Sequence, residues 1–348
     1  MTGKVIKFGA LGFVCFFLCT LVLLFPNVSS GGAKSGILLC GEVIIPSLFP
    51  FCVLALFCQK SGLLLFFSKL FSPISKKVFH LSGEEFCIFL MSFFAGYPVG
   101  MRMIKEQYDK GRITQKKAQR MALYCINAGP AFIVSAIGGG MLGDRTTGKY
   151  LLLSQAFATL LLCFVIEFKN KADNTISSDN NLSLCDAFVE STADGAKAVF
   201  SICCWVILFS SFISVINCKI LPSFIVKILN YSLEVTTGAA AANGNILIIC
   251  ALLSFAGFSV HCQVYSVGKN CAPKYSVFLI YRAIHAVISV TATFIFLMLD
   301  NRTVQTISNG INTVRENTSF TYASSAALIL MSVFLIISVN SQKNYNLV

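Results

Sequence analysis

The residues of this chain that could do chemistry stand where glycine or proline interrupts an apolar run. The first interruption is "AGYPVG", in which Gly96, Tyr97, Pro98 and Gly100 follow a membrane-like stretch. Glycine and proline are unfavourable inside an ordinary helix, so we expect the helix to break here. A break frees backbone N–H and C=O groups, and a free helix N-terminus carries a partial positive charge that can hold an anion. Ligand binding is therefore the chemistry expected of this segment.

A second interruption, "NAGP", divides another apolar segment and contains Asn127, Gly129 and Pro130. Pro130 lacks an N–H and so frees the carbonyl of Ile126. The Asn127 amide has both donors and an acceptor that could bind a substrate. A structural kink that is capped by Asn127 explains the same residues equally well.

The segment "LEVTTG" places Glu234, Thr236 and Thr237 directly before a long uncharged run. The threonine hydroxyls and the N-terminus of the helix that follows would suit a carboxylate ligand or an ion. A simple capping turn is the alternative for these three residues.

The segment "AGFSVHCQ" is a further break and carries Gly257, His261 and Gln263. His261 could titrate near neutral pH, which would suit a binding site. A single histidine in a membrane segment also serves as a hydrogen-bonding group between helices.

Glu42 lies inside the second apolar segment of the chain. A carboxylate near the centre of a membrane costs about 2.5–3.5 kcal/mol, which makes Glu42 a candidate for coupling transport to a proton or Na⁺. If Glu42 lies near the interface, the cost shrinks and a structural role suffices. The sequence contains no H-E-x-x-H or G-x-S-x-G motif, so we expect no catalytic residues, no metal and no cofactor.

The elements that must position these residues are membrane helices. The chain has 348 residues, of which 56% are hydrophobic and 12% are charged, whereas soluble domains have about 25% charged residues. We expect a polytopic all-α membrane protein with roughly eight apolar segments, some of them broken or re-entrant. The clearest charge-free windows are Phe8–Pro26, Met121–Gly143, Ala198–Cys218 and Asn317–Gln342.

The positive charge follows the pattern of a membrane protein. The net charge is +12, and the lysines and arginines stand mostly in short loops, as in the cytoplasmic loops of membrane proteins. They are not interleaved with aromatic residues, so the expected partner is a lipid bilayer and not nucleic acid. The N-terminal run is longer than a usual signal core and is expected to be the first span.

Two stretches of the chain resemble each other. "GAKSGILLCGEVIIPSLF" from Gly32 and "GAKAVFSICCWVILFSSF" from Gly195 are identical at eight of eighteen positions, and "FAGYPVGMRM" from Phe94 aligns with "FAGFSVHCQV" from Phe255. Chance similarity between apolar runs is the alternative to an internal duplication. A duplication with interrupted segments is typical of secondary transporters, in which substrate binds near the midplane. The predicted parts are a first span (1–31), a first repeat (32–168), a polar linker (169–182), a second repeat (183–300), and a polar loop with a C-terminal span (301–348).

Five motifs occur in an order that resembles a known family: "PSLFPF" from Pro46, "GYPVG", "NAGPAFI", "LEVTTG" and "GFSVHCQ". Together they are similar to the sporulation integral membrane protein family of endospore formers, the YlbJ type, which is grouped with nucleoside-recognition, or Gate, membrane domains. The resemblance spans about residues 32–290. It implies a role in spore maturation and the movement of dipicolinic acid from the mother cell toward the forespore. Met101 and Cys262 depart from the alanines that the family commonly has, which leaves the substrate open.

We therefore expect a sporulation-associated transporter of a small anionic metabolite, with dipicolinic acid as the first candidate. Its expected location is the bacterial cell membrane or the outer forespore membrane. Nucleoside or nucleobase transport and a non-transporting scaffold for the spore envelope are the alternatives. Further partners compatible with these functions are a second copy of the chain and other sporulation membrane proteins.

Overall fold

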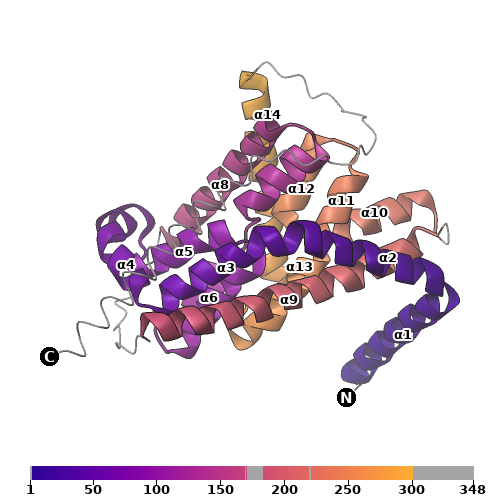
Figure 1. Ribbon diagram of the computed structural model, residues 1–348, viewed down its shortest axis with the longest axis horizontal. Helices are drawn as coiled ribbons and strands as arrows, with labels where there is room; N and C mark the ends of the chain where they lie inside the picture. The colour runs from indigo at the N-terminus through magenta and orange to yellow at the C-terminus, as the bar shows by residue number, and fades with distance from the viewer. Residues whose placement is uncertain (1, 169, 171–182, 219–220, 301–348) are drawn as a thin grey trace.

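A computed structural model describes residues 2–168, 170, 183–218 and 221–300 (Figure 1). Every regular element in these residues is a helix, as the sequence predicts. Five helices are long and apolar enough to cross a membrane, or six if one helix pair bent by 90° counts as a span. The predicted C-terminal segment and, apart from residue 170, the predicted polar linker lie outside the described residues.

The helices of the N-terminal half are α1 (Thr2–Leu24), α2 (Pro26–Leu39), η1 (Cys40–Ile44), α3 (Ile45–Lys60), α4 (Leu63–Ile74), η2 (Ser75–Phe79), α5 (Gly83–Ala95), α6 (Tyr97–Asp109), α7 (Gln115–Tyr124), η3 (Phe132–Met141) and α8 (Arg145–Glu167). Those of the C-terminal half are α9 (Leu184–Ile216), α10 (Ser223–Leu233), α11 (Val235–Ala241), α12 (Ile246–Phe255), α13 (Gly257–Gly268), η4 (Lys269–Cys271) and α14 (Tyr275–Leu299).

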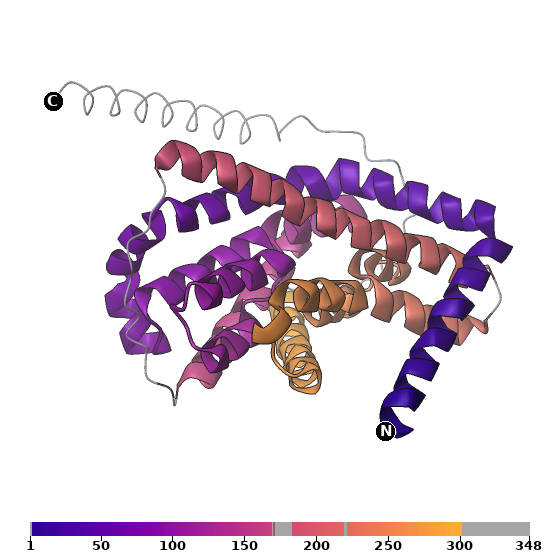
Figure 2. The same cartoon turned by 90° about the horizontal axis from the view of Figure 1, so that it is seen from below.

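Two long helices form one face of the molecule. α2, η1 and α3 make a continuous helix of 35 residues that runs antiparallel to α9 (Figure 2). At one end Ser29 Oγ lies 2.7 Å from Ser211 Oγ, and at the other Lys60 Nζ lies 3.0 Å from Glu190 Oε2. Glycine allows close packing between them, because a Cβ at Gly36 would lie 2.9 Å from the backbone of α9.

Each half also contains a helical hairpin. At Gly96 the backbone φ is +88°, which favours glycine. A Cβ at Gly100 would lie 2.8 Å from Cβ of Ser92, so residues eight apart are in contact and α6 folds back on α5. α10 and α11 fold back in the same way, because a Cβ at Gly238 would lie 3.1 Å from the Asn230 carbonyl oxygen.

A broken helix follows the first hairpin. The predicted window Met121–Gly143 is not one continuous helix, because α7 ends at Tyr124 and η3 begins only at Phe132. The two pieces nevertheless run along the whole of α8 in the opposite direction. Lys117 of α7 pairs with Glu167 at the end of α8, and Gly138 of η3 packs against Gly148 near its start.

A second broken helix follows the second hairpin. α12 and α13 meet at Ala256, which has a left-handed φ of +72°, and together they pass as one apolar span. They run antiparallel to α14, since Cys250 contacts Thr293 while His261 contacts Tyr275. Each half therefore contains a long helix, a hairpin, a broken helix and a straight helix in the same order.

The two breaks that the sequence pairs differ in geometry. "FAGYPVG" and "FAGFSVH" both contain a break, but α5–α6 turns back at its break whereas α12–α13 continues across. In chain order, α5–α6 and α10–α11 form the hairpins, whereas α7–η3 and α12–α13 form the broken helices. The reason is that a glycine only ends a helix, and packing against other helices decides the direction that the chain then takes.

Candidate functional site

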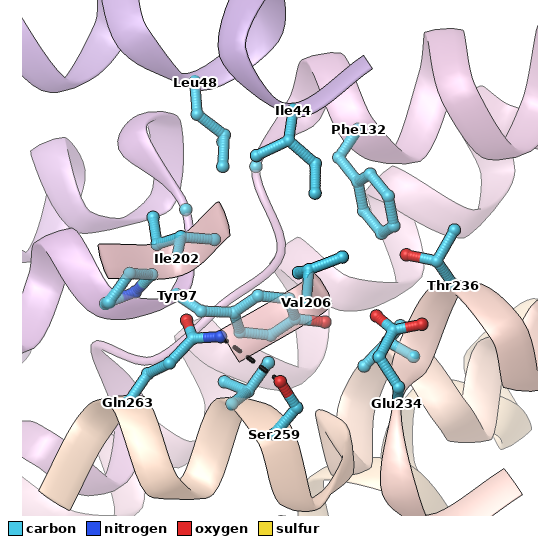
Figure 3. A pocket seen from close by; sticks show the side chains of 15 residues that line it. Ile44, Leu48, Tyr97, Phe132, Ile202, Val206, Glu234, Thr236, Ser259 and Gln263 are labelled. Atoms are coloured by element: carbon cyan, nitrogen blue, oxygen red, sulfur yellow. Dashed lines mark hydrogen bonds between the residues drawn. The ribbon is translucent and has the colours of Figure 1, made fainter. Parts of the chain in front are cut away.

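The hairpin tips meet the helix breaks around one cavity of about 60 Å³ (Figure 3). In the first half a Cβ at Gly96 would lie 3.6 Å from the amide nitrogen of Gly129. In the second half a Cβ at Gly257 would lie 3.2 Å from the amide nitrogen of Val235. The long helices cover this junction with the apolar side chains Ile44, Leu48, Ile202 and Val206.

Seven of the predicted site residues line this cavity: Gly96, Tyr97, Pro98, Gly129, Glu234, Thr236 and Gln263. They come from all four interrupted motifs, at the hairpin tips and breaks of both halves. The remaining predicted residues are not in its lining: Gly100, Asn127, Pro130, Thr237, Gly257, His261 and the coupling candidate Glu42. Glu42 is exposed on η1, outside the cavity.

The cavity has apolar walls and a few polar groups. In Figure 3 the Tyr97 ring lies between Glu234 and Thr236 on one side and Gln263 and Ser259 on the other. Gln263 Nε2 donates to Ser259 Oγ at 3.4 Å. Mostly apolar walls with a small number of convergent polar groups are typical of a small-molecule site.

Glu234 has two roles in the structure. Its Oε2 accepts from the Thr237 backbone N–H at 2.7 Å and so caps α11, which confirms the capping turn. The residue is only 4% exposed, and its carboxylate also faces the cavity. Capping and cavity lining are therefore compatible here, although the sequence presents them as alternatives.

The carbonyl groups that the second break releases are bonded to side chains from other elements. The last three carbonyls of α12 accept hydrogen bonds as follows: Leu253 from Tyr97 at 2.6 Å, Ser254 from Arg282 at 3.4 Å and Phe255 from His261 at 2.9 Å. Because a carbonyl only accepts, the Nε2 atom of His261 carries the hydrogen. His261 is thus a structural group behind the break.

Arg282 also donates hydrogen bonds to carbonyl groups at the first break. Its guanidinium donates to the carbonyls of Leu123 at 3.1 Å and Ile126 at 2.5 Å, and Ile126 is the residue whose carbonyl Pro130 frees. Arg282 is fully buried. Within the described part of the chain, it forms no ion pair with a carboxylate. One buried positive charge therefore joins the two breaks.

Asn127 serves the kink and not the cavity. Its Nδ2 donates to the Tyr124 carbonyl at 2.8 Å, and its Oδ1 accepts from Thr159 at 2.8 Å. The Thr159 hydroxyl also lies 3.0 Å from Nε2 of His285 on α14. The structural alternative, a kink capped by asparagine, is confirmed.

The backbone N–H groups that the breaks free differ from the freed carbonyls, because no side chain caps them. α6 begins at Tyr97, directly after Gly96, and α13 begins at Gly257, directly after Ala256, and neither N-terminus has a side-chain cap. Both helices open onto the cavity, through Tyr97 and Pro98 of α6 and Ser259 of α13. The uncapped N–H groups and the helix dipoles give this junction a partial positive character.

The sequence analysis missed a buried ion cluster behind the first break. Lys117 Nζ lies 3.2 Å from Glu85 Oε2 and 3.2 Å from Glu167 Oε2, and the Tyr124 hydroxyl donates to Glu167 Oε1 at 3.2 Å. All four side chains are almost completely buried. The sequence does indicate this cluster, because the spacing of Lys117, Arg120 and Tyr124 places them on one face of α7. The cluster fixes α7 against α5 and α8. Among the described residues, no three His, Cys, Asp or Glu side chains gather as a metal site would require.

The fold and the cavity define a polytopic helical membrane protein with a buried site between broken helices. The chain is similar to the sporulation integral membrane protein YlbJ of Bacillus subtilis (strain 168), with 21% identity over 329 residues that cover 81% of this chain and 80% of that protein. This similarity confirms the resemblance in the five motifs and makes the chain a homologue of a sporulation membrane protein. No family model and no solved structure matches the chain.

Proposed function

We propose that the protein is a secondary transporter that moves a small anionic metabolite during sporulation, with dipicolinic acid as the substrate. The observation that carries the proposal is the meeting of two hairpin tips with two helix breaks at one buried cavity. A scaffold would gain nothing from such breaks, because each one weakens a membrane helix and leaves polar backbone that must be satisfied. No catalytic step is part of the proposal.

The polarity of the junction supports an anion. The carbonyls at the end of α12 and at the first break accept hydrogen bonds from Tyr97, His261 and Arg282. The N-termini of α6 and α13 keep donors that no side chain caps. An anion at these N-termini would also lie near the buried positive charge of Arg282, because Arg282 and the cavity residue Tyr97 donate to consecutive carbonyls at the end of α12.

The cavity is smaller than the proposed substrate. A volume of about 60 Å³ has room for about four water molecules. A pyridine ring with two carboxylates needs more space. We infer that the hairpin tips must move apart before the substrate enters, as in transporters that expose a fixed site alternately to each side.

The arrangement of the two halves supports the same mechanism. Cys40 Sγ contacts the Cys203 carbonyl at 3.8 Å in the middle of the two antiparallel long helices, and these residues are matched in the sequence alignment of the halves. Contact between matched residues of antiparallel helices is expected for halves related by a two-fold axis. We propose an inverted repeat, which is a common architecture of secondary transporters.

The test is uptake of radiolabelled dipicolinate by vesicles that contain only this protein. We expect uptake that saturates and that excess unlabelled dipicolinate inhibits. In an endospore former, deletion of the gene should give spores that are low in dipicolinate and sensitive to heat. Vesicles without uptake, together with normal spores from the deletion strain, would disprove the proposal.

A nucleoside or nucleobase is the second candidate substrate. The observation in its favour is the pair Glu234 and Gln263, whose carboxylate and amide could bind the hydroxyl and amino groups of such a ligand. The same vesicles distinguish the candidates by competition. Inhibition by uridine or adenosine and not by pyridine carboxylates would favour the nucleoside.

A further inference from the structure

We propose that Glu234 binds a proton together with the anionic substrate, so that the protein is a proton symporter. This inference rests on the proposed function, because it needs an anion in the cavity. The proton would bind at the carboxylate oxygen of Glu234 that does not cap α11.

The surroundings of Glu234 supply no counter-charge. Its side chain lies in a largely apolar cavity, and Oε2 is held by the Thr237 N–H. No lysine, arginine or histidine forms an ion pair with it among the residues that the structure describes. The buried Arg282 donates to the carbonyls of both breaks through its two terminal nitrogens.

The neighbouring elements carry few groups that could replace Glu234 in this role. Titratable or charged groups at the breaks and beside the cavity include Cys40 on η1, Tyr97 on α6, Tyr231 on α10, Cys250 on α12, His261 on α13 and Arg282 on α14. Three carboxylates of these elements lie elsewhere: Glu42 on η1 is exposed outside the cavity, and Glu106 and Asp109 on α6 pair with lysines of the same segment. Tyr97 and Tyr231 donate to backbone carbonyls, Cys250 contacts Thr293, and His261 is hydrogen-bonded through both ring nitrogens. Among the residues that line the cavity, Glu234 is the single carboxylate.

Because the cavity is small, the charge state of Glu234 determines whether an anionic substrate can bind beside it. The N-termini of α6 and α13 would hold a substrate carboxylate in the same small space that the Glu234 carboxylate faces. Two carboxylates that share one site do not both stay ionised, and one of them takes up a proton. A proton on Glu234 removes the repulsion and lets the new O–H group donate to the substrate carboxylate.

The cycle is balanced in atoms, and with a dianionic substrate and one proton it moves one net negative charge across the membrane. One proton binds Glu234 from the side where the substrate enters, and the Glu234 O–H bond breaks again when the substrate leaves on the other side. No bond of the substrate forms or breaks. A proton gradient across the membrane would therefore drive accumulation of the anion.

The first measurement uses the unaltered protein in vesicles that contain a pH indicator. Radiolabelled dipicolinate is added outside, at pH values where both of its carboxyl groups are ionised. We expect uptake to increase when the outside is more acidic, and the lumen to acidify as dipicolinate enters. For one linked proton, the apparent affinity for dipicolinate should fall by about tenfold for each unit by which the outside pH is raised.

The second measurement compares variants of single carboxylates. Glu234→Gln resembles the protonated side chain and can still cap α11 through its amide oxygen. We expect it to exchange labelled for unlabelled dipicolinate with no dependence on pH, and to carry no protons. Glu190→Gln is the matched control, because Glu190 is 53% exposed and pairs with Lys60 on the surface. It should keep both the pH dependence and the proton movement.

Three results would overturn the inference without touching the proposed function. One is dipicolinate uptake by the unaltered protein with no acidification of the lumen. Another is a Glu234→Gln variant with the same pH dependence and proton movement as the unaltered protein. The third is loss of coupling in Glu42→Gln instead, which would assign the proton to the exposed residue that the sequence predicts. If the unaltered protein takes up no dipicolinate under any gradient, the proposed function itself fails.

Discussion

Single side chains make the helix breaks possible in an apolar environment. Arg282 bonds to carbonyls at both breaks, and Tyr97 reaches from the first hairpin to the Leu253 carbonyl of the second half. A carbonyl that is buried without a partner is costly, so these contacts hold the two halves together at the cavity. Tyr97 therefore lines the cavity, and its hydroxyl also satisfies a backbone carbonyl behind the cavity.

We predict that Tyr97→Phe destabilises the folded protein by about 1–3 kcal/mol, because the Leu253 carbonyl loses its donor while it stays buried. The matched control is Tyr108→Phe on the same helix, whose hydroxyl has no hydrogen-bond partner among the described residues. Thermal unfolding of both purified variants in detergent measures the difference. Equal unfolding temperatures for the two variants would show that the Tyr97 hydroxyl is not needed.

Helix packing at the hairpin tip depends on glycine at two positions for two reasons. Gly96 has the left-handed backbone that forms the tip, whereas Gly100 has an ordinary helical backbone in a very tight place. A Cβ at Gly100 would lie 2.1 Å from the Cys125 carbonyl oxygen, at the start of the first break. The sequence predicts Gly100 as a binding residue, and the structure gives it a packing role.

We predict that Gly100→Ala reduces the amount of folded protein in the membrane, because α6 must move away from the first break to admit one methyl group. Gly31→Ala is the matched control, since a Cβ there meets no atom within 4 Å. Alanine in place of that exposed helical glycine should stabilise α2 by up to about 1 kcal/mol. Membrane-inserted protein is measured by gel filtration of detergent extracts. A Gly100→Ala variant that is as abundant and as monodisperse as Gly31→Ala would contradict the packing argument.

The sequence predicts the breaks themselves better than it predicts their surroundings. Glycine and proline at residues 96, 98, 129 and 257 mark the interruptions because their backbone preferences are local. The apolar cover from Ile44, Leu48 and Val206 could not be predicted, since these residues look like any others in a membrane helix. Arg282 is visible in the sequence, but its partners depend on which carbonyls the fold brings to it. For the same reason the sequence alone does not give the direction that the chain takes after each break.

At the scale of the whole molecule, the two ends between which the chain crosses differ in their content of basic residues. The end that holds α4 and the turn between α6 and α7 carries most of the basic residues, including Lys69, Lys76, Lys110 and Arg112. Basic loops are retained in the cytoplasm. The turn between η3 and α8 lies at the other end, because α8 has 23 residues and spans about 34 Å, close to the thickness of a bilayer core.

The last prediction follows from this arrangement and concerns topology. α7 and η3 run the length of α8 in the opposite direction, so the turns at Gly111 and Gly143 should face opposite sides of the membrane. Both glycines are exposed and have a left-handed φ, and a Cβ added at either one would meet no atom within 4 Å. They are therefore matched sites for a short epitope tag. We expect protease to digest the tag at Gly143 in intact cells, and to reach the tag at Gly111 only after the membrane is permeabilised. A third tag after Asn217, at the end of α9, should behave like the tag at Gly143, since α9 begins beside Lys60 at the basic end. If the tags at Gly111 and Gly143 are digested together, α7–η3 re-enters instead of crossing, and the two halves cannot be inverted copies of each other.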